Sequence, residues 1–127
     1  MPIYLTLDEV LRIHELLIDA FGGARGVRDA GLVESALLRP QTGHYADLVE
    51  EAAALWESLA NHGFIDGNKR VAYACVELFL QMNGLDIVAG NDELERLIYS
   101  NLEAGTFRKD VIDAWLREQT APFDLDA

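Results

Sequence analysis

The amino-acid sequence predicts an all-α fold: a compact bundle of about six helices with a buried central helix and at most a small β-hairpin flap. Apolar residues recur at the three- and four-residue spacing of amphipathic helices along most of the chain. Residues that start or stop helices stand at the ends of these stretches. Alternation of apolar and polar residues, which is typical of strands, is limited to residues 85–90 (LDIVAG).

The length of the chain predicts its domain organisation. The 127 residues suffice for one domain with its own core, so we expect residues 1–127 to form a single domain. Half of the residues are hydrophobic, and no stretch has the composition of a linker. Residues 121–127 (APFDLDA) are the exception, and we expect them to fray or to dock loosely.

The first expected helix begins after Thr6, because Thr6 and Glu9 have the spacing of a capping box. Its apolar residues extend to Phe21, and the glycines at 22–23 end it. His14 lies within this helix. We interpret it as a surface or hydrogen-bonded histidine rather than a metal ligand, because no second ligand residue stands at matching spacing.

A short second helix is expected to follow Asp29, which can cap it, and to end at Pro40. Its apolar side consists of Leu32, Val33, Ala36 and Leu37. Residues 40–47 (PQTGHYAD) contain turn residues without a helical period, which favours a loop or a short hairpin. His44 and Tyr45 in this segment could touch a ligand, although exposed loop residues more often have no such role.

The third and fourth helices carry the predicted core. A broad apolar face begins at Leu48 and predicts the third helix. The fourth helix is expected to begin near Asn68 and to end at residues 83–84. Only Glu77 and Gln81 interrupt its apolar surface after the first turn, so we expect this helix to be central and the most deeply buried.

Two further helices complete the predicted bundle. Asn91 or Asp92 can cap the fifth, and Gly105 can end it. The last helix carries Val111 and Trp115 on its apolar side.

The formal charge of −12 comes from 22 acidic and 10 basic residues. Because phosphate binding relies on clustered Lys and Arg, this balance argues against direct binding to nucleic acid or to an anionic membrane. The start of the chain does not resemble a signal peptide, and no apolar run approaches the ~18 residues of a membrane span, so we expect a cytoplasmic protein. Cys75 is the single cysteine and is expected in the core.

Residues 62–70 (HGFIDGNKR) gather polar side chains directly before the predicted central helix. The N-terminus of a helix offers unpaired backbone N–H groups and the positive end of the helix dipole, which together bind anions. Lys69 and Arg70 add two cations, and Gly67 allows a ligand to approach the backbone. We therefore expect Gly67, Asn68, Lys69 and Arg70 to hold a phosphate chain.

Two residues of the same segment suggest the chemistry. Asp66 suits a site for phosphates only if a hard cation bridges them, and Mg²⁺ takes carboxylate and phosphate oxygens. His62 can accept a proton near neutral pH and is the expected general base for a hydroxyl that attacks phosphorus. The hypothesis is phosphoryl or nucleotidyl transfer. The alternative is a polar connecting loop, with Asn68 as the helix cap and Lys69 and Arg70 solvated.

The segment HGFIDGNKR resembles the motif of the Fic/Doc (Fido) superfamily, and specifically of its death-on-curing (Doc) toxin branch. The Fic branch carries HPFxxGNGRxxR. Here Lys69 stands where that motif has its last glycine, Tyr73 stands where it has its second arginine, and both departures match Doc. Residues 22–41 resemble the Doc segment before the flap, and residues 78–84 resemble the end of its central helix.

The resemblance implies a Fido fold and a toxin of a type II toxin–antitoxin system. It implies that the chain binds ATP and Mg²⁺ and transfers the γ-phosphate to a threonine of elongation factor Tu, which arrests translation. By position, His62 is the general base and Asp66 the Mg²⁺-associated acid. Lys69 and Arg70 also belong to the catalytic set, and Asn68 lies with them on the phosphate site.

Lys69 separates two activities within this family. In Fic proteins the glycine at its position leaves room for the α- and β-phosphates, and AMP is transferred to a protein hydroxyl. A lysine fills that space, so the resemblance favours the kinase and leaves Fic-type adenylyl transfer as the alternative. Residues 41–47 correspond to the flap that would hold the protein substrate beside the site.

The resemblance also bears on regulation. Many Fic enzymes carry an inhibitory helix with the pattern [S/T]xxxE[G/N], but no Ser or Thr of this sequence is followed four residues later by Glu. Inhibition is therefore expected in trans, from a Phd-like antitoxin that lays a helix along the toxin. A module that only binds, for example in repression of its own operon, is the function of a different class that the sequence leaves open.

Overall fold

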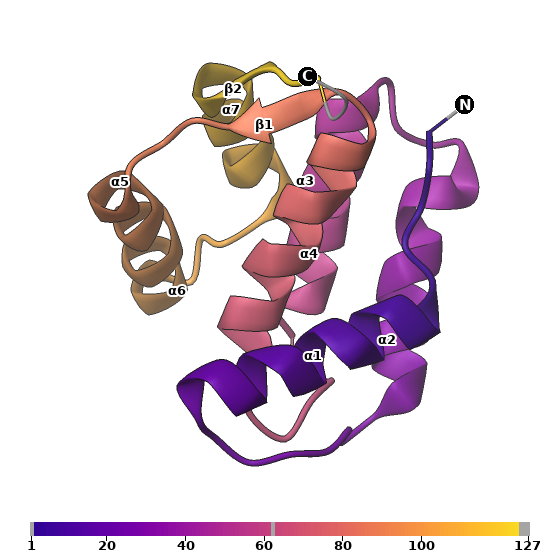
Figure 1. Cartoon of the computed structure of the whole chain (residues 1–127). Helices are drawn as coiled ribbons and strands as arrows, with labels where there is room; N and C mark the ends of the chain where they lie inside the picture. Colours follow the sequence, from indigo (N-terminus) through magenta and orange to yellow (C-terminus); the bar gives the residue numbers. More distant parts are fainter. Residues whose placement is uncertain (1, 62, 125–127) are drawn as a thin grey trace.

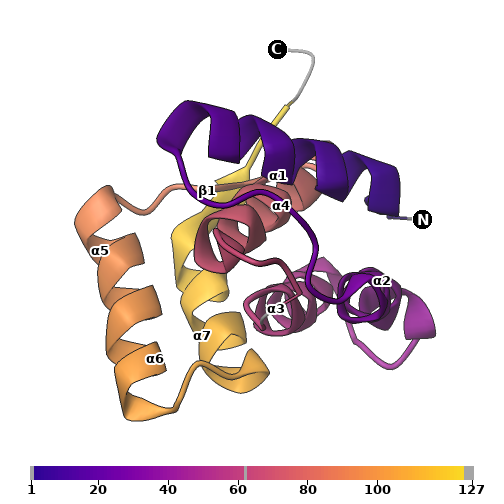
Figure 2. The ribbon, with the colours of Figure 1, turned by 90° about the horizontal axis from the view of Figure 1, so that it is seen from below.

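The helix that follows the motif, α4 (Asn68–Met82), runs through the centre of the fold (Figure 1). No residue from 71 to 82 is exposed. Helix α3 (Leu48–Leu59) lies beside α4, and α1 (Leu7–Phe21) crosses near its first turn (Figures 1 and 2). The prediction of a buried central helix is confirmed.

The computed structural model describes residues 2–61 and 63–124. Besides α1, α3 and α4, these residues form α2 (Ala30–Leu38), the 3₁₀ turn η1 (Arg39–Thr42), α5 (Asn91–Glu95), the π-helical turn η2 (Arg96–Ser100), α6 (Asn101–Ala104), α7 (Lys109–Gln119) and two short strands. The segments α5, η2 and α6 follow one another without a break, so we treat them as one helix, helix 91–104. The described part of the chain thus has six helices, and the all-α prediction is confirmed.

Helix α1 begins as the sequence predicts. The Glu9 backbone N–H donates to Thr6 Oγ1 (3.2 Å), and the Thr6 N–H donates to Glu9 Oε1 (2.9 Å), which is a complete capping box. The helix ends at Gly22, whose φ of 84° is a conformation that favours glycine.

Helix α2 is capped by Asp29, whose side chain accepts from the Leu32 N–H at 3.2 Å. Its buried side chains are Val33, Ala36 and Leu37. The prediction was wrong for Leu32, which is 45% exposed, because Val33, Ala36 and Leu37 form the buried face and Leu32 lies beside it. Beyond η1 the chain runs as a loop to residue 47 and forms no strand there, so the loop alternative for this segment holds.

The predicted cap of the fifth helix was wrong. Gly90 precedes the helix in an extended conformation, and no side chain caps it. Asn91 is already helical, and the acidic residues Asp92 and Glu93 in the first turn favour the positive end of the dipole instead. The predicted stop at Gly105 is confirmed, with the glycine at φ 73°.

Residues 121–123 of the C-terminal segment dock onto the fold, which is one of the two alternatives that the sequence predicts. Strand β2 (Thr120–Pro122) pairs antiparallel with β1 (Leu85–Ile87), and the N–H of Phe123 donates to the carbonyl of Gly84 at 2.9 Å. The polypeptide after α7 is therefore bound to the end of α4 through residue 123, and residues 125–127 lie outside the described part.

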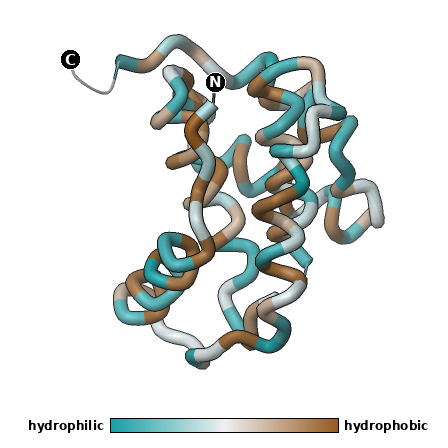
Figure 3. Tube along the Cα trace, turned by 90° about the vertical axis from the view of Figure 1, so that its right-hand side faces the viewer, coloured by the Kyte–Doolittle hydropathy of each residue, from teal (hydrophilic) through white to brown (hydrophobic). Residues whose placement is uncertain are grey.

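The core lies between α3, α4 and α7. Trp56 is 1% exposed, and its ring centroid is 5.8 Å from Tyr73 and 5.9 Å from both Phe107 and Trp115. Cys75 is buried in the core as predicted, and this burial raises the pKa of its thiol to about 12. Apolar residues recur at short intervals along the helices (Figure 3). None of the described helices has the length and apolar character to cross a membrane.

Candidate functional site

The first turn of α4 presents free backbone donors. Gly67 precedes the helix with φ 78° and has no side chain to cap it. The first bond into the helix runs from the Val71 N–H to the Gly67 carbonyl (2.9 Å). Within residues 2–61 and 63–124, the N–H groups of Asn68, Lys69 and Arg70 have no acceptor. No acidic residue lies in this turn, so it has the properties of an anion site.

Asn68 closes the loop before the helix. Its Oδ1 accepts from the Phe64 N–H and its Nδ2 donates to the Phe64 carbonyl, both at 3.0 Å. Asn68 is the first helical residue, and Gly67 occupies the cap position. The interpretation of Asn68 as a cap was therefore wrong, because its side chain turns back to Phe64. What Asn68 offers a phosphate is its backbone N–H.

Asp66 lies between the loop and the end of α1. Its Oδ2 accepts from the Ala24 N–H at 3.0 Å, and its Oδ1 accepts from the Gly67 N–H at 2.8 Å. These bonds, first from Ala24 and then from Gly67, lower the pKa of the Asp66 carboxyl below its ordinary value. The carboxylate is thus ionised at neutral pH, and each oxygen keeps a lone pair for a further partner.

The donor set at Asp66 fits a magnesium ion bound together with phosphates. In the described part of the chain, no group of three or more His, Cys, Asp or Glu side chains could hold a metal ion unaided. Mg²⁺ commonly takes one or two carboxylates from a protein and the rest of its oxygen ligands from phosphates and water. Asp66 provides one such carboxylate.

The backbone of the loop is fixed by the segment between α1 and α2. The Gly63 carbonyl accepts from the N–H groups of Arg28 and Asp29, both at 2.9 Å, and the Ile65 N–H donates to the Gly26 carbonyl at 3.1 Å. Gly63 is also required sterically. A Cβ at this position would lie 2.8 Å from Cγ2 of Val33.

His14 of α1 contacts the same loop through a hydrogen bond and a ring stack. Its Nε2 is 2.8 Å from the carbonyl oxygen of Asp66, so this nitrogen carries a proton and donates. The ring is 3% exposed and stacks on Phe64, with centroids 4.1 Å apart. The hydrogen-bonded interpretation of His14 is therefore supported, but its contact with the motif was missed. The sequence did indicate that His14 is buried, because it stands four residues from both Val10 and Ile18 on the buried face of α1.

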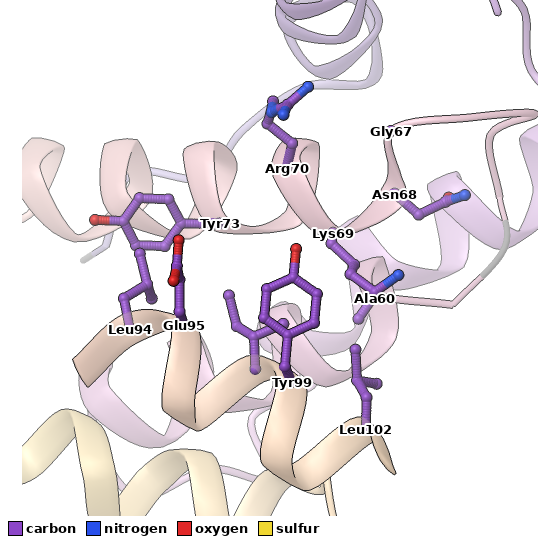
Figure 4. Close-up of a pocket in the computed structure, with 11 residues that line it drawn as sticks. Ala60, Gly67, Asn68, Lys69, Arg70, Tyr73, Leu94, Glu95, Tyr99 and Leu102 are labelled. Atoms are coloured by element: carbon purple, nitrogen blue, oxygen red, sulfur yellow. The ribbon is translucent and has the colours of Figure 1, made fainter. Parts of the chain in front are cut away.

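The two cations of the motif point in different directions. Lys69 extends from α4 toward Ala60, whereas Arg70 extends toward the opposite side of the helix (Figure 4). The Arg70 guanidinium lies over the ring of Phe21, at 4.3 Å from its centroid. Both side chains are exposed, and neither forms an ion pair with a described residue. Their charges are therefore open to a ligand.

A pocket opens beside Lys69, between α4 and helix 91–104 (Figure 4). Its volume is about 540 Å³, within the range of small-molecule sites. The lining residues on the α4 side include Asn68, Lys69 and Tyr73, and those on helix 91–104 include Glu95 and Tyr99. The first turn of α4 thus forms one end of this pocket.

The remaining predicted residues take different positions. His62, the predicted general base, lies outside the described residues. His44 is exposed. Tyr45 belongs to a structural network, because its hydroxyl accepts from Arg39 Nε (2.7 Å) and Lys109 Nζ lies 5.5 Å from its ring centroid. The structure gives Tyr45 no part in the site at α4.

Comparison with known proteins identifies relatives. A sequence profile described as the Fic/DOC family matches residues 4–80. The chain is 43% identical over 98 residues to "Toxin Doc" of Mycolicibacterium smegmatis, and the alignment covers 72% of this chain and 73% of that protein. It is 32% identical over 89 residues to "Protein kinase doc" of Escherichia phage P1, and this alignment covers 66% of this chain and 71% of that protein. The profile match includes the whole motif and ends within α4.

Proposed function

The chain belongs to the Fic/DOC family, and from this premise we propose that it is the toxin of a toxin–antitoxin pair and acts as a protein kinase. The substrates are Mg-ATP and a threonine of elongation factor Tu, and phosphorylation of that threonine arrests translation. The similarity to a protein named as a toxin and to one named as a protein kinase supports this proposal. The threonine and the elongation factor rest on the resemblance of residues 62–70 to the Doc branch.

Lys69 is the observation that carries the choice of a kinase. Its side chain extends from the first turn of α4, beside three backbone donors that are free among the described residues. Glycine at this position would leave space for two phosphates at the helix end. The lysine instead fills part of that space with a cation, which favours one terminal phosphate over an extended α,β-diphosphate.

The other residues of the motif take separate parts in the proposed reaction. His62 accepts the proton of the threonine hydroxyl as its oxygen attacks the γ-phosphorus, and ADP leaves. The amides of Asn68 and Lys69, with the Arg70 guanidinium, bind phosphate oxygens. Asp66 holds the Mg²⁺, which when bound neutralises part of the phosphate charge.

Labelled ATP tests the proposal directly. Elongation factor Tu is incubated with the purified protein and ATP labelled either on the γ-phosphate or in the adenine. We expect only the γ-label in the protein product. Adenine label would show AMP transfer instead. The Lys69→Gly variant is expected to lose phosphate transfer and to gain adenine label, because it restores the glycine of the Fic motif.

A His62→Ala variant separates catalysis from binding. Expressed without an antitoxin, it is expected to be harmless where the parent arrests growth. Equal toxicity would mean that catalysis by His62 is not the source of the effect, and a binding role would then explain the protein better.

We further propose that residues 1–127 act as one Fido-type domain in the cytoplasm and are inhibited in trans by a Phd-like antitoxin. Co-expression with the product of a short neighbouring reading frame is the test. Restored growth, together with a complex that co-purifies, is the expected result.

A further inference from the structure

His14 is a polar side chain in an otherwise apolar environment. Among the described residues, only His14 and Glu51 are polar and buried. Glu51 accepts a hydrogen bond from the Tyr4 hydroxyl, whereas His14 donates from Nε2 to the carbonyl of Asp66 at 2.8 Å. A buried polar ring costs free energy unless it is hydrogen-bonded, and an apolar ring would fill this position without needing a partner. The choice of histidine therefore points to the bond with Asp66.

The carbonyl that His14 contacts belongs to the peptide group between Asp66 and Gly67. In a trans peptide the carbonyl oxygen and the N–H point in opposite directions, so a partner that fixes one of them also fixes the other. The N–H of this group donates to Asp66 Oδ1 at 2.8 Å. His14 thus acts, through one rigid peptide group, on the direction of the Asp66 carboxylate.

Gly67 leaves this peptide group free to rotate. Its φ is 78°, and rotation of the peptide plane by half a turn would give it a negative φ, which glycine adopts equally well. The rotation would withdraw the Gly67 N–H from Oδ1 and leave the carboxylate with the Ala24 N–H as its remaining described donor. The bond from His14 opposes the rotation, and the stack of its ring on Phe64, with 15° between the ring planes, holds the donor in place.

We propose that His14 is a positioning residue for the magnesium site, whose N–H holds the Asp66–Gly67 peptide group so that the Asp66 carboxylate is directed at the ion. The inference rests on the proposed function, because it takes Asp66 as the Mg²⁺ ligand, and it adds the residue that orients this ligand. The ring is buried beneath the loop, so it acts through Asp66 and not on the ion or the phosphates. Replacing a side chain that orients a metal ligand typically lowers metal affinity about 10- to 100-fold.

Two substitutions separate the hydrogen bond of His14 from its ring. His14→Gln keeps an N–H donor near the position of Nε2 and loses the ring, whereas His14→Phe keeps a ring to stack on Phe64 and loses the donor. Calorimetry measures the binding of inorganic tripolyphosphate with Mg²⁺ and, separately, with EDTA. We expect His14→Phe to bind the magnesium complex about 10-fold more weakly than the parent and the metal-free anion equally well. His14→Gln should bind both as the parent does.

Three controls separate this effect from a general loss of stability. Val10→Ala truncates another buried side chain of α1, one turn before His14, and should lower the melting temperature without changing either affinity. If His14→Phe does not fold, His14→Met removes the donor with an adaptable apolar side chain and should show the same loss. In an Asp66→Asn background, His14→Phe should cause no further loss of affinity for the magnesium complex, because an effect through Asp66 requires its carboxylate.

The outcomes separate this inference from the proposed function. Unchanged affinity for Mg-tripolyphosphate in His14→Phe overturns the positioning role and leaves the kinase intact. Equal losses in His14→Gln and His14→Phe, or a loss that persists in the Asp66→Asn background, also overturn it and assign His14 to packing. A parent whose tripolyphosphate affinity does not depend on Mg²⁺ overturns the metal role of Asp66 together with this inference. A parent that binds Mg-tripolyphosphate but transfers no γ-phosphate overturns the kinase alone.

Discussion

The two flanks of the first turn of α4 are held in different ways. On the side of α1, the loop over residues 63–67 is bound to His14 and to residues 24–29 by backbone and side-chain hydrogen bonds. On the other side, helix 91–104 stands apart from α1–α3 (Figure 2) and buries mainly Leu97 and Ile98. Cavities of about 540 and 720 Å³ lie along it, the first toward α4 and the second toward α7.

This difference suggests a division of tasks. Reacting groups need a fixed geometry, and Asp66, which we propose as part of the reaction, lies on the flank where nearly every polar group of the loop has a partner. The other flank carries the two cavities, where more movement is tolerated. The Fic/DOC profile, which matches residues 4–80, covers the first flank and stops before the second.

The largest expected effect comes from Asp66→Ala on the fixed flank. The variant loses the carboxylate that we propose to hold Mg²⁺ and the acceptor for the N–H groups of Ala24 and Gly67. We expect phosphate transfer to fall roughly 100- to 1000-fold. The control on the other flank is Asp92→Ala, an exposed acid outside the pocket. Equal losses in both variants would contradict the division of tasks.

Leu97→Ala should loosen the second flank alone. Truncation of this buried side chain is expected to lower the free energy of local opening of helix 91–104 by about 2–3 kcal/mol. Hydrogen exchange measured by mass spectrometry should then be faster in residues 91–104 and unchanged in residues 63–71. Equal acceleration in both segments would mean that the two flanks open together.

Two neighbouring glycines offer a matched pair on the fixed flank. Both have positive φ, but a Cβ on Gly22 meets nothing within 4 Å, whereas a Cβ on Gly23 would lie 2.7 Å from Asp66 Oδ2. Gly22→Ala should cost about 1–3 kcal/mol in unfolding free energy from the backbone alone, because its φ of 84° and ψ of 175° lie in a region reserved for glycine, and Gly23→Ala about 1–2 kcal/mol more from the clash. Urea unfolding measures both. Equal values would show that Asp66 moves aside freely.

The smallest effect is the response to acid. Because the folded protein lowers the pKa of the Asp66 carboxyl, its ionisation stabilises the fold above the ordinary aspartate pKa of about 3.9, and this contribution is lost as the pH falls through the lowered folded-state pKa. The difference in melting temperature between the parent and Asp66→Asn should therefore shrink as the solution is acidified below that range. A constant difference would contradict this account.

Local patterns in the sequence predicted what local interactions decide. The capping box of Thr6 and Glu9, the cap at Asp29 and the stop at Gly105 each involve partners a few residues apart, and all three are present. The order of the six helices follows from the same kind of pattern, because helical hydrogen bonds and packing faces repeat over one turn.

Contacts between distant residues could not be predicted in this way. Asp66 bonds to Ala24 across 42 positions and to His14 across 52, and no spacing rule links such pairs. The pairing of β2 with β1 depends likewise on where α7 ends in space. A local pattern misled the prediction at Asn68. Asparagine is a common helix cap, but the side chain of Asn68 bonds to the backbone of Phe64 instead.

The hydrogen bonds that hold the loop come mostly from residues earlier in the chain. Apart from Val71, whose N–H donates to the Gly67 carbonyl within α4, the described partners that hold residues 63–67 from outside the motif precede it, from His14 to Asn61. During synthesis from the N-terminus these preceding partners leave the ribosome before the loop does. The loop can therefore form its hydrogen bonds as soon as α4 emerges. Helix 91–104 follows later. A growing chain would therefore acquire the first turn of α4, with its free backbone donors, before the wall of the neighbouring pocket.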